Sequence, residues 1–108
     1  MAHIDFKEED GQDLDKLIQE HKEAPTFVDF NATWCGPCRA LKPQLESICQ
    51  KNKFNFISVD VDENPETSEK HSVQGIPYVA LYVKGEKIYD FTGNKQDKLN
   101  EAIEKAKS

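Results

Sequence analysis

The sequence predicts an α/β fold of three layers, with a mixed central β-sheet of about five strands flanked by about four helices. Two observations favour this class. Short runs of β-branched and aromatic residues alternate with stretches in which apolar residues recur at helical spacing. Strands joined through helices pair in parallel, whereas the last two predicted strands are joined by a tight turn and form an antiparallel hairpin. The expected order is β-α-β-α-β-α-β-β-α.

The first quarter of the chain predicts a strand, a helix and a second strand. We expect a short strand near residues 4–7 and a helix over residues 12–22. Four residues occupy one face of that helix: Leu14, Leu17, Ile18 and His21. Pro25 then introduces residues 26–30, a run of β-formers apolar enough to be a buried strand.

A second helical pattern follows Cys38. Its apolar face comprises Leu41, Leu45 and Ile48. Residues 54–61 predict the next strand. A short helix should begin at Asn64 and Pro65, because asparagine is a favoured N-cap and proline fits the first helical position, and it should end before Val73.

The C-terminal segment predicts the hairpin and a last helix. Residues 78–83 and 87–92 are strands, and residues 84–86 form the turn between them. The last helix should be capped near Asn94. Its apolar face comprises Leu99, Ala102, Ile103 and Ala106. We see no linker or repeat, so residues 1–108 are expected to form a single domain.

Composition narrows the possible partners and compartment. The net charge of -6 argues against nucleic acid or an anionic membrane as a main partner. No apolar run approaches the roughly 18 residues of a membrane helix. The N-terminus lacks the basic start and apolar stretch of a signal peptide, so we expect a cytoplasmic protein. Three cysteines do not suggest a disulfide framework, and a close pair in a reducing compartment indicates redox or metal chemistry.

Cys35 lies where a buried strand ends and a helix begins, which is the edge at which such sheets bind ligands. The free N–H groups and the positive end of the helix dipole stabilise a thiolate there and make it a better nucleophile. Cys38 follows three residues later on the same helical face, so the two sulfurs can close a tight disulfide. We expect Cys35 to be exposed and Cys38 to be more covered.

The residues between the cysteines suit this chemistry. Gly36 lets a partner backbone come close, and Pro37 fits the first helical turn because no intrahelical bond is lost there. The alternative is half of a zinc site, which needs four ligands, commonly in two close pairs. The remaining candidate ligands are scattered along the chain: His3, His21, Cys49 and His71. We therefore expect no metal.

The segment from Trp34 to Cys38, Trp-Cys-Gly-Pro-Cys, matches the active-site motif of the thioredoxin family residue for residue. Further segments resemble the family along nearly the whole chain: Phe27 to Phe30, Pro43, Val59 to Pro65, Gly75 to Pro77, Gly85 and Gly93. Together these motifs are highly specific. The resemblance implies the three-layer thioredoxin fold and a thiol–disulfide oxidoreductase.

The resemblance also implies a division of labour among three residues. Cys35 is the nucleophile that attacks a target disulfide, and Cys38 resolves the mixed disulfide. Asp29 matches the family's buried acid and would accept the proton of Cys38, because burial in an apolar strand raises the pKa of a carboxyl. A structural acid without a catalytic role remains the alternative for Asp29.

A substrate groove is implied beside the cysteines. Ile76 and Pro77 resemble the family's cis-proline loop, whose backbone would pair with an extended target segment. Trp34 would provide a flat apolar platform, with core packing as its alternative role. Gly75 and Gly93 would leave room for the partner backbone.

Three positions differ from the family pattern. Tyr78 stands where threonine is common, and Asn31 stands where an aromatic or small residue is often found. Ser58 replaces a lysine that many members carry near the buried acid, which removes a cation from the surroundings of Asp29. These differences should affect the tuning of the site and its choice of partners more than the core reaction. Cys49 is expected to be a small buried hydrophobe, with a regulatory thiol as the alternative.

The expected function is that of a protein-disulfide reductase with no bound cofactor. The resemblance to the family implies that its electrons would come from NADPH through a thioredoxin reductase, and that its clients would include peroxiredoxin, methionine sulfoxide reductase and ribonucleotide reductase. The alternatives are an oxidase or isomerase of the same fold and a redox-independent binding subunit. We expect a monomer, because no extra element is left over to bury.

Overall fold

The computed structural model describes all of residues 1–108. Its sheet has five strands in the order β1-β3-β2-β4-β5. The strands are β1 (His3–Asp5), β2 (Thr26–Asn31), β3 (Asn55–Asp60), β4 (Tyr78–Val83) and β5 (Glu86–Thr92). β3 pairs in parallel with β1 and β2, and β4 pairs antiparallel with β2 and β5. The predicted mixed sheet is confirmed.

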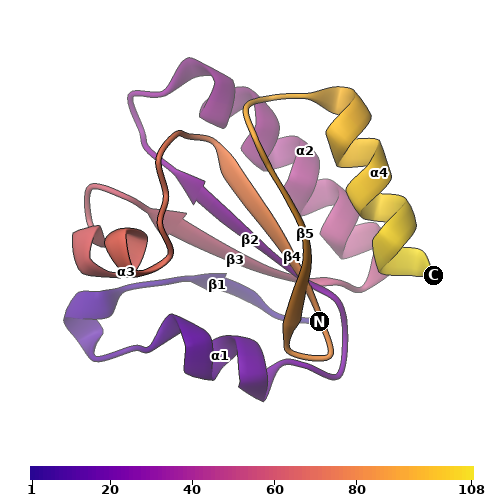
Figure 1. The fold of residues 1–108 in the computed structure, drawn as a ribbon, viewed down its shortest axis with the longest axis horizontal. Coiled ribbons are helices and arrows are strands. Elements are labelled where there is room, and N and C mark those ends of the chain that lie inside the picture. Colours follow the sequence, from indigo (N-terminus) through magenta and orange to yellow (C-terminus); the bar gives the residue numbers. More distant parts are fainter.

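Four α-helices and one short 3-10 helix, η1, connect and cover the strands. They are η1 (Glu8–Asp10), α1 (Leu14–Glu20), α2 (Gly36–Asn52), α3 (Pro65–Lys70) and α4 (Gln96–Lys107). Figure 1 shows α2 and α4 on one side of the sheet and α1 and α3 on the other, which confirms the three layers. None of these helices combines the length and the apolar character needed to cross a membrane.

β2 is the central strand, and all six of its residues are buried. Because side chains alternate along a strand, its two faces serve different cores. Phe27 packs with residues of α2 and α4, whereas Val28 and Phe30 pack on the side of α1. By the same alternation Asp29 and Asn31 share the face of Phe27, which places both polar side chains beneath α2.

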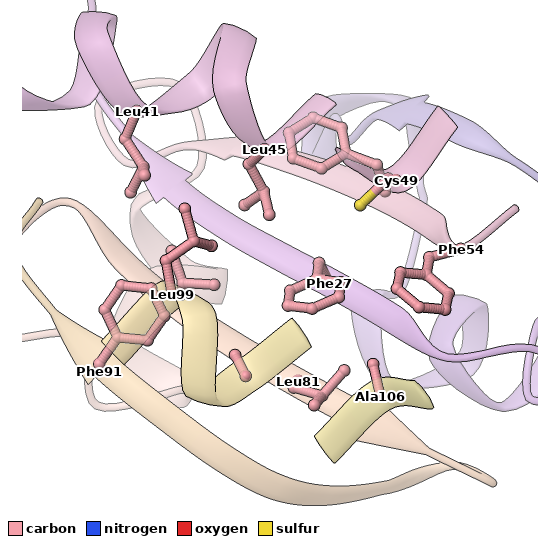
Figure 2. Close-up of a cluster of buried hydrophobic side chains, with 12 residues drawn as sticks. Phe27, Leu41, Leu45, Cys49, Phe54, Leu81, Phe91, Leu99 and Ala106 are labelled. Atoms are coloured by element: carbon pink, nitrogen blue, oxygen red, sulfur yellow. The ribbon is translucent and has the colours of Figure 1, made fainter. Parts of the chain in front are cut away.

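The larger core lies between the sheet and the pair α2 and α4. Figure 2 shows Leu41 and Leu45 of α2 directed toward Phe27 of β2, with side chains of α4 closing the opposite side. The sulfur of Cys49 lies within this cluster, and the residue is 1% exposed. The interpretation of Cys49 as a small buried hydrophobe is therefore confirmed.

The first strand and the first helix differ from their predicted bounds. The first strand spans His3–Asp5, slightly before residues 4–7. Helix α1 begins at Leu14, later than predicted, because the side chain of Asp13 accepts a hydrogen bond from Lys16 N at 3.1 Å. An aspartate at the N-cap satisfies a backbone donor that the helix itself leaves free.

Asn64 is the N-cap of α3 and Pro65 is its first residue, as predicted, but the asparagine side chain does not cap the helix. Instead Asn64 Oδ1 accepts from Glu8 N at 2.8 Å, and the Glu8 carboxylate accepts from Thr67 N at 2.9 Å. The loop at η1 thus caps α3 from outside, which lowers the pKa of Glu8 chiefly through the backbone N–H of Thr67.

The last two elements follow the prediction with small differences. Lys84 and Gly85 have positive φ angles of 56° and 81°, the backbone that a two-residue turn between twisted strands requires. Strand β5 begins at Glu86, one residue earlier than predicted. The N-cap of α4 is Lys95 without a side-chain bond, and the side chain of Asn94 accepts from Gln96 instead.

Candidate active site

The N-terminus of α2 brings Cys35 and Cys38 together. Cys35 is the N-cap of the helix, and its sulfur accepts a hydrogen bond from Cys38 N at 3.3 Å. The two side chains form a disulfide, with their Cα atoms 5.2 Å apart. The predicted pairing is therefore confirmed. In the reduced protein the same backbone N–H and the helix dipole would stabilise a thiolate on Cys35.

The prediction that Cys35 is exposed is wrong. Cys35 is 6% exposed and Cys38 is 2% exposed, so Cys38 is the more covered of the two, as expected, but both are buried. Cys35 packs with Ala32, and the partly buried side chains of Val61 and Ile76 lie against this small cluster. Val61 and Ile76, which lie far away in the sequence, thus help to cover Cys35.

Trp34 lies beside the disulfide at the surface. Its side chain is 65% exposed, which rules out the alternative role in core packing. Its indole Nε1 donates a hydrogen bond to Asp62 Oδ2 at 2.7 Å. Sequence reasoning missed Asp62, because an acidic run at a strand end most often lies in solvent. The contact fixes the polar edge of the ring and leaves its apolar face available.

The loop before β4 borders the site, with Ile76 against the cysteine cluster. The Ile76–Pro77 peptide bond is cis, as predicted. Gly93 N donates to Pro77 O at 2.8 Å, which ties this loop to the end of β5. A Cβ atom on Gly75 would lie only 3.1 Å from Cγ2 of Thr92, so a side chain at this position would crowd a residue of the protein itself. That Gly75 and Gly93 leave room for a partner stays a prediction.

Tyr78 follows this loop but packs on the other face of the sheet. Its ring lies 5.6 Å from that of Phe30, on the side of α1. Its hydroxyl donates to Asp90 Oδ2 at 2.7 Å and accepts from Lys87 Nζ at 3.1 Å. The tyrosine therefore links β4 to β5 rather than lining the surface around the cysteines.

Asp29 lies fully buried on β2, beneath α2. Burial raises the pKa of its carboxyl from the ordinary 3.8 to about 6, against the opposing effects of a hydrogen bond from Asn31 and the charge of Lys42. The Asn31 amide donates to Asp29 Oδ2 at 3.3 Å, while Oδ1 has no hydrogen-bond partner. A buried carboxyl near this pKa can exchange a proton close to neutral pH.

A crevice of about 440 Å³ opens beside Cys38. Asn31 and Ser58 of the sheet line it, together with Cys38, Arg39 and Lys42 of α2. Asp29 does not line the crevice itself, but Asn31, which donates to its carboxylate, and Ser58, which lies opposite it on β3, do. Neither Asn31 nor Ser58 was predicted as a site residue, although both stood out as differences from the family pattern.

No group of three or more His, Cys, Asp or Glu side chains is arranged to hold a metal ion. His71 pairs with Asp15 at 3.0 Å, and His3 pairs with Glu46 at 3.4 Å. Two of the four candidate zinc ligands, His3 and His71, therefore pair with carboxylates.

A disulfide within one helical turn, set beyond the central strand of a three-layer α/β sheet and beside a cis-proline loop, defines a thiol–disulfide oxidoreductase. The family model described as Thioredoxin matches residues 5–105. The chain belongs to the thioredoxin family.

Individual relatives agree with this assignment. Thioredoxin of Gallus gallus is 36% identical over 92 residues, which cover 84% of this chain and 88% of that protein. Thioredoxin of Staphylococcus saprophyticus is 42% identical over 82 residues, 73% of this chain and 79% of the relative.

Solved structures give the same result. The crystal structure of Fasciola hepatica thioredoxin is 36% identical, with a TM-score of 0.82 over 98% of this chain and 99% of that one. A chain from a study of thiol resolving in yeast mitochondrial 1-Cys peroxiredoxin via glutathione/thioredoxin systems is 26% identical. It has a TM-score of 0.78 over 97% of this chain and 94% of that one.

Proposed function

We propose that this oxidoreductase is a protein-disulfide reductase in which Cys35 is the nucleophile and Cys38 the resolving thiol. The Cys35 thiolate bonds to one client sulfur, and the second client sulfur leaves as a thiolate. Cys38 then loses its proton and attacks the Cys35 sulfur, which releases the first client sulfur as a thiolate. The client gains two electrons, and the Cys35–Cys38 disulfide forms. The observation that carries the proposal is that this disulfide closes within the first turn of α2.

Asp29 is the proposed acceptor of the Cys38 proton. The strand alternation that places it beneath α2, its full burial and the missing partner of Oδ1 support this role. A pKa near 6 makes the carboxylate the main form at neutral pH while keeping it basic enough to take a proton.

The client is proposed to bind across the exposed surface around the disulfide. Seven residues would contact it: Trp34, Gly36, Pro37, Gly75, Ile76, Pro77 and Gly93. The exposed indole and the exposed Gly36 and Pro37 support this placement, since they flank Cys35 in the chain. The backbone of Ile76 would pair with an extended client segment.

The oxidised protein would be recharged by a thioredoxin reductase that draws on NADPH, so the chain would act as an electron carrier without a bound cofactor. We place it in the cytoplasm as a monomer whose 108 residues act as one domain. Peroxiredoxin, methionine sulfoxide reductase and ribonucleotide reductase are the proposed clients. The likeness to a chain studied with a 1-Cys peroxiredoxin supports the first of these.

The deciding measurement is the equilibrium of the Cys35–Cys38 pair against defined glutathione buffers, with oxidation followed by thiol alkylation and mass. A reductase requires a potential more reducing than the cytosolic glutathione pool. A clearly oxidising potential would indicate an oxidase or isomerase instead. A Cys35→Ser, Cys38→Ser variant that still served its partners fully would indicate a redox-independent binding subunit.

A further inference from the structure

Asn31 bridges the buried acid and the neighbouring strand. Its Nδ2 lies 3.3 Å from Asp29 Oδ2 and 3.0 Å from Ser58 Oγ, and it also lies 3.1 Å from the Asp29 carbonyl oxygen. All three residues are buried, with exposed fractions of 8%, 0% and 6% for Asn31, Asp29 and Ser58. The three side chains therefore form one polar group inside the protein.

The sheet register brings these side chains together. Asp29 and Asn31 are two residues apart on β2, so they point to the same face. Asp29 lies opposite Ser58 in the parallel pairing of β2 with β3. Each position therefore follows from the strand pairing, and none of the three residues has a positive φ angle.

A count of donors shows what the amide does. An amide nitrogen has two hydrogens, and here the acceptors around it are the Asp29 carboxylate, the Asp29 carbonyl and the Ser58 hydroxyl. Asn31 is the only hydrogen-bond donor to the Asp29 carboxylate, through Oδ2. Oδ1 of Asp29 is the one buried side-chain oxygen or nitrogen of the chain that lacks a partner. The two oxygens of the carboxylate are thus made inequivalent.

We propose that Asn31 is a positioning residue for the resolving step, because its amide holds Asp29 Oδ2 and leaves Oδ1 as the oxygen that receives the Cys38 proton. This inference rests on the proposed role of Asp29. In the step the S–H bond of Cys38 breaks and an O–H bond forms at Oδ1, directly or through one water molecule. The electron pair stays on sulfur, which attacks Cys35. The proton later leaves toward the crevice that Asn31, Ser58 and Cys38 line.

Other charges near Asp29 come from α2. Lys42 lowers the pKa of Asp29 and Glu46 raises it, and both act without a hydrogen bond. Cys49 stays a neutral thiol, because burial raises its pKa to about 12. β3 and β4 place the uncharged Ser58 and Val79 opposite Asp29. Burial raises the pKa of Asp29, and without the Asn31 amide only the charge of Lys42 would oppose that effect. Removing the amide should therefore raise the pKa of Asp29 further.

The test uses Asn31→Ala and Asn31→Ser, a matched pair in which only the second keeps a donor. Each reduced protein reacts once with insulin across a pH series, acid stops the reaction, and mass analysis counts the mixed disulfide on Cys35. Carbon NMR follows the Asp29 carboxyl in the same variants. In Asn31→Ala we expect two pH midpoints, that of mixed-disulfide resolution and that of the Asp29 carboxyl titration, to rise by about one pH unit or more. Resolution of the mixed disulfide should return to normal at high pH. Asn31→Ser should return both midpoints toward those of the parent protein.

Two further variants separate the possible failures. Asp29→Asn should accumulate mixed disulfide over the whole pH range; if it resolves normally, the proposed role of Asp29 is wrong. If Asp29→Asn accumulates it but Asn31→Ala keeps the parent midpoints, the inference about Asn31 is overturned and the role of Asp29 stands. A loss of mixed-disulfide resolution that is the same at every pH in both Asn31 variants would show that Asn31 has a merely structural role. That result would also overturn the inference about Asn31. Ser58→Ala, which keeps the amide on Asp29, should retain the parent midpoints.

Discussion

The indole nitrogen of Trp34 donates to Asp62 Oδ2 at 2.7 Å, across a separation of 28 residues in the chain. Trp34 is the only tryptophan of the protein. Because this contact holds an exposed ring beside the disulfide, it should orient the surface that clients meet. The fluorescence of the protein should report directly on that orientation.

We therefore expect Asp62→Ala to lower kcat/KM for insulin reduction about three- to ten-fold, the equivalent of roughly 1 kcal/mol. The ring would gain freedom, so tryptophan fluorescence anisotropy should fall. Glu63→Ala is the matched control, since it removes an acid from the same loop but not the acceptor of the indole. Equal losses in both variants would mean that the loop charge matters and the hydrogen bond does not.

The two cysteines should have separable roles. Cys38→Ser should trap a stable mixed disulfide between Cys35 and a client, because the resolving thiol is absent. Cys35→Ser should form no adduct under the same conditions. Non-reducing electrophoresis and intact mass distinguish these outcomes. An adduct on Cys38 in the Cys35→Ser variant, formed as fast as that on Cys35, would exchange the proposed roles.

Asp29 should make stability depend on pH. Its folded pKa of about 6 exceeds the ordinary 3.8, so the folded state binds the extra proton. This contribution to stability is fully present below about pH 3.8 and is lost as the pH rises through about 6. Asp29→Asn should therefore be more stable than the parent at pH 7.5 by about 3 kcal/mol, with the difference vanishing near pH 3.5. Urea denaturation at both pH values tests this, and a constant difference would contradict it.

Cys49 should be chemically silent in the folded protein. It is 1% exposed, and burial, with smaller effects of Asp29 and Glu46, raises the pKa of its thiol to about 12. Iodoacetamide should label the reduced protein at Cys35 and reach Cys49 only after unfolding, as followed by peptide mass. Cys49→Ala should keep full reductase activity and lose about 1–2 kcal/mol of stability. Rapid native labelling of Cys49 would revive the alternative of a regulatory thiol.

The side chain of Thr92, as well as any partner, should limit which residues can replace Gly75. An added Cβ would lie 3.1 Å from Thr92 Cγ2, so Gly75→Ala should cost about 1 kcal/mol of stability. Thr92→Ser removes that methyl group and should restore the stability in the double variant, as measured by thermal denaturation. If client reduction is restored as well, the glycine serves the internal contact. If stability returns but activity does not, Gly75 leaves room for the client backbone.

The hydrophobic pattern predicted most of the fold. Strand β4 has the predicted bounds, β2 is one residue longer at its end, and β3 is one residue shorter at each end, because continuous apolar runs and proline or glycine boundaries are local signals. The cysteine pair and the buried acid were predicted from local patterns, and the cis-proline loop was predicted from the resemblance to the family. The bond that caps the first turn of α3 was not predicted, because the Glu8 carboxylate that accepts from Thr67 N lies 59 positions earlier in the chain.

The sequence by itself thus determined the element order, the active-site motif and the burial of Asp29, since each depends on the residue types within a few positions. Only the tertiary structure decided that Cys35 is covered, that Asp62 holds Trp34, and that Asn31 joins Asp29 to Ser58 across 27 residues. The physical reason is the distance along the chain over which each kind of interaction acts. Periodicity and capping act between neighbours in the chain, whereas access to a sulfur and the donors around a carboxylate depend on side chains that packing brings together from distant strands and loops.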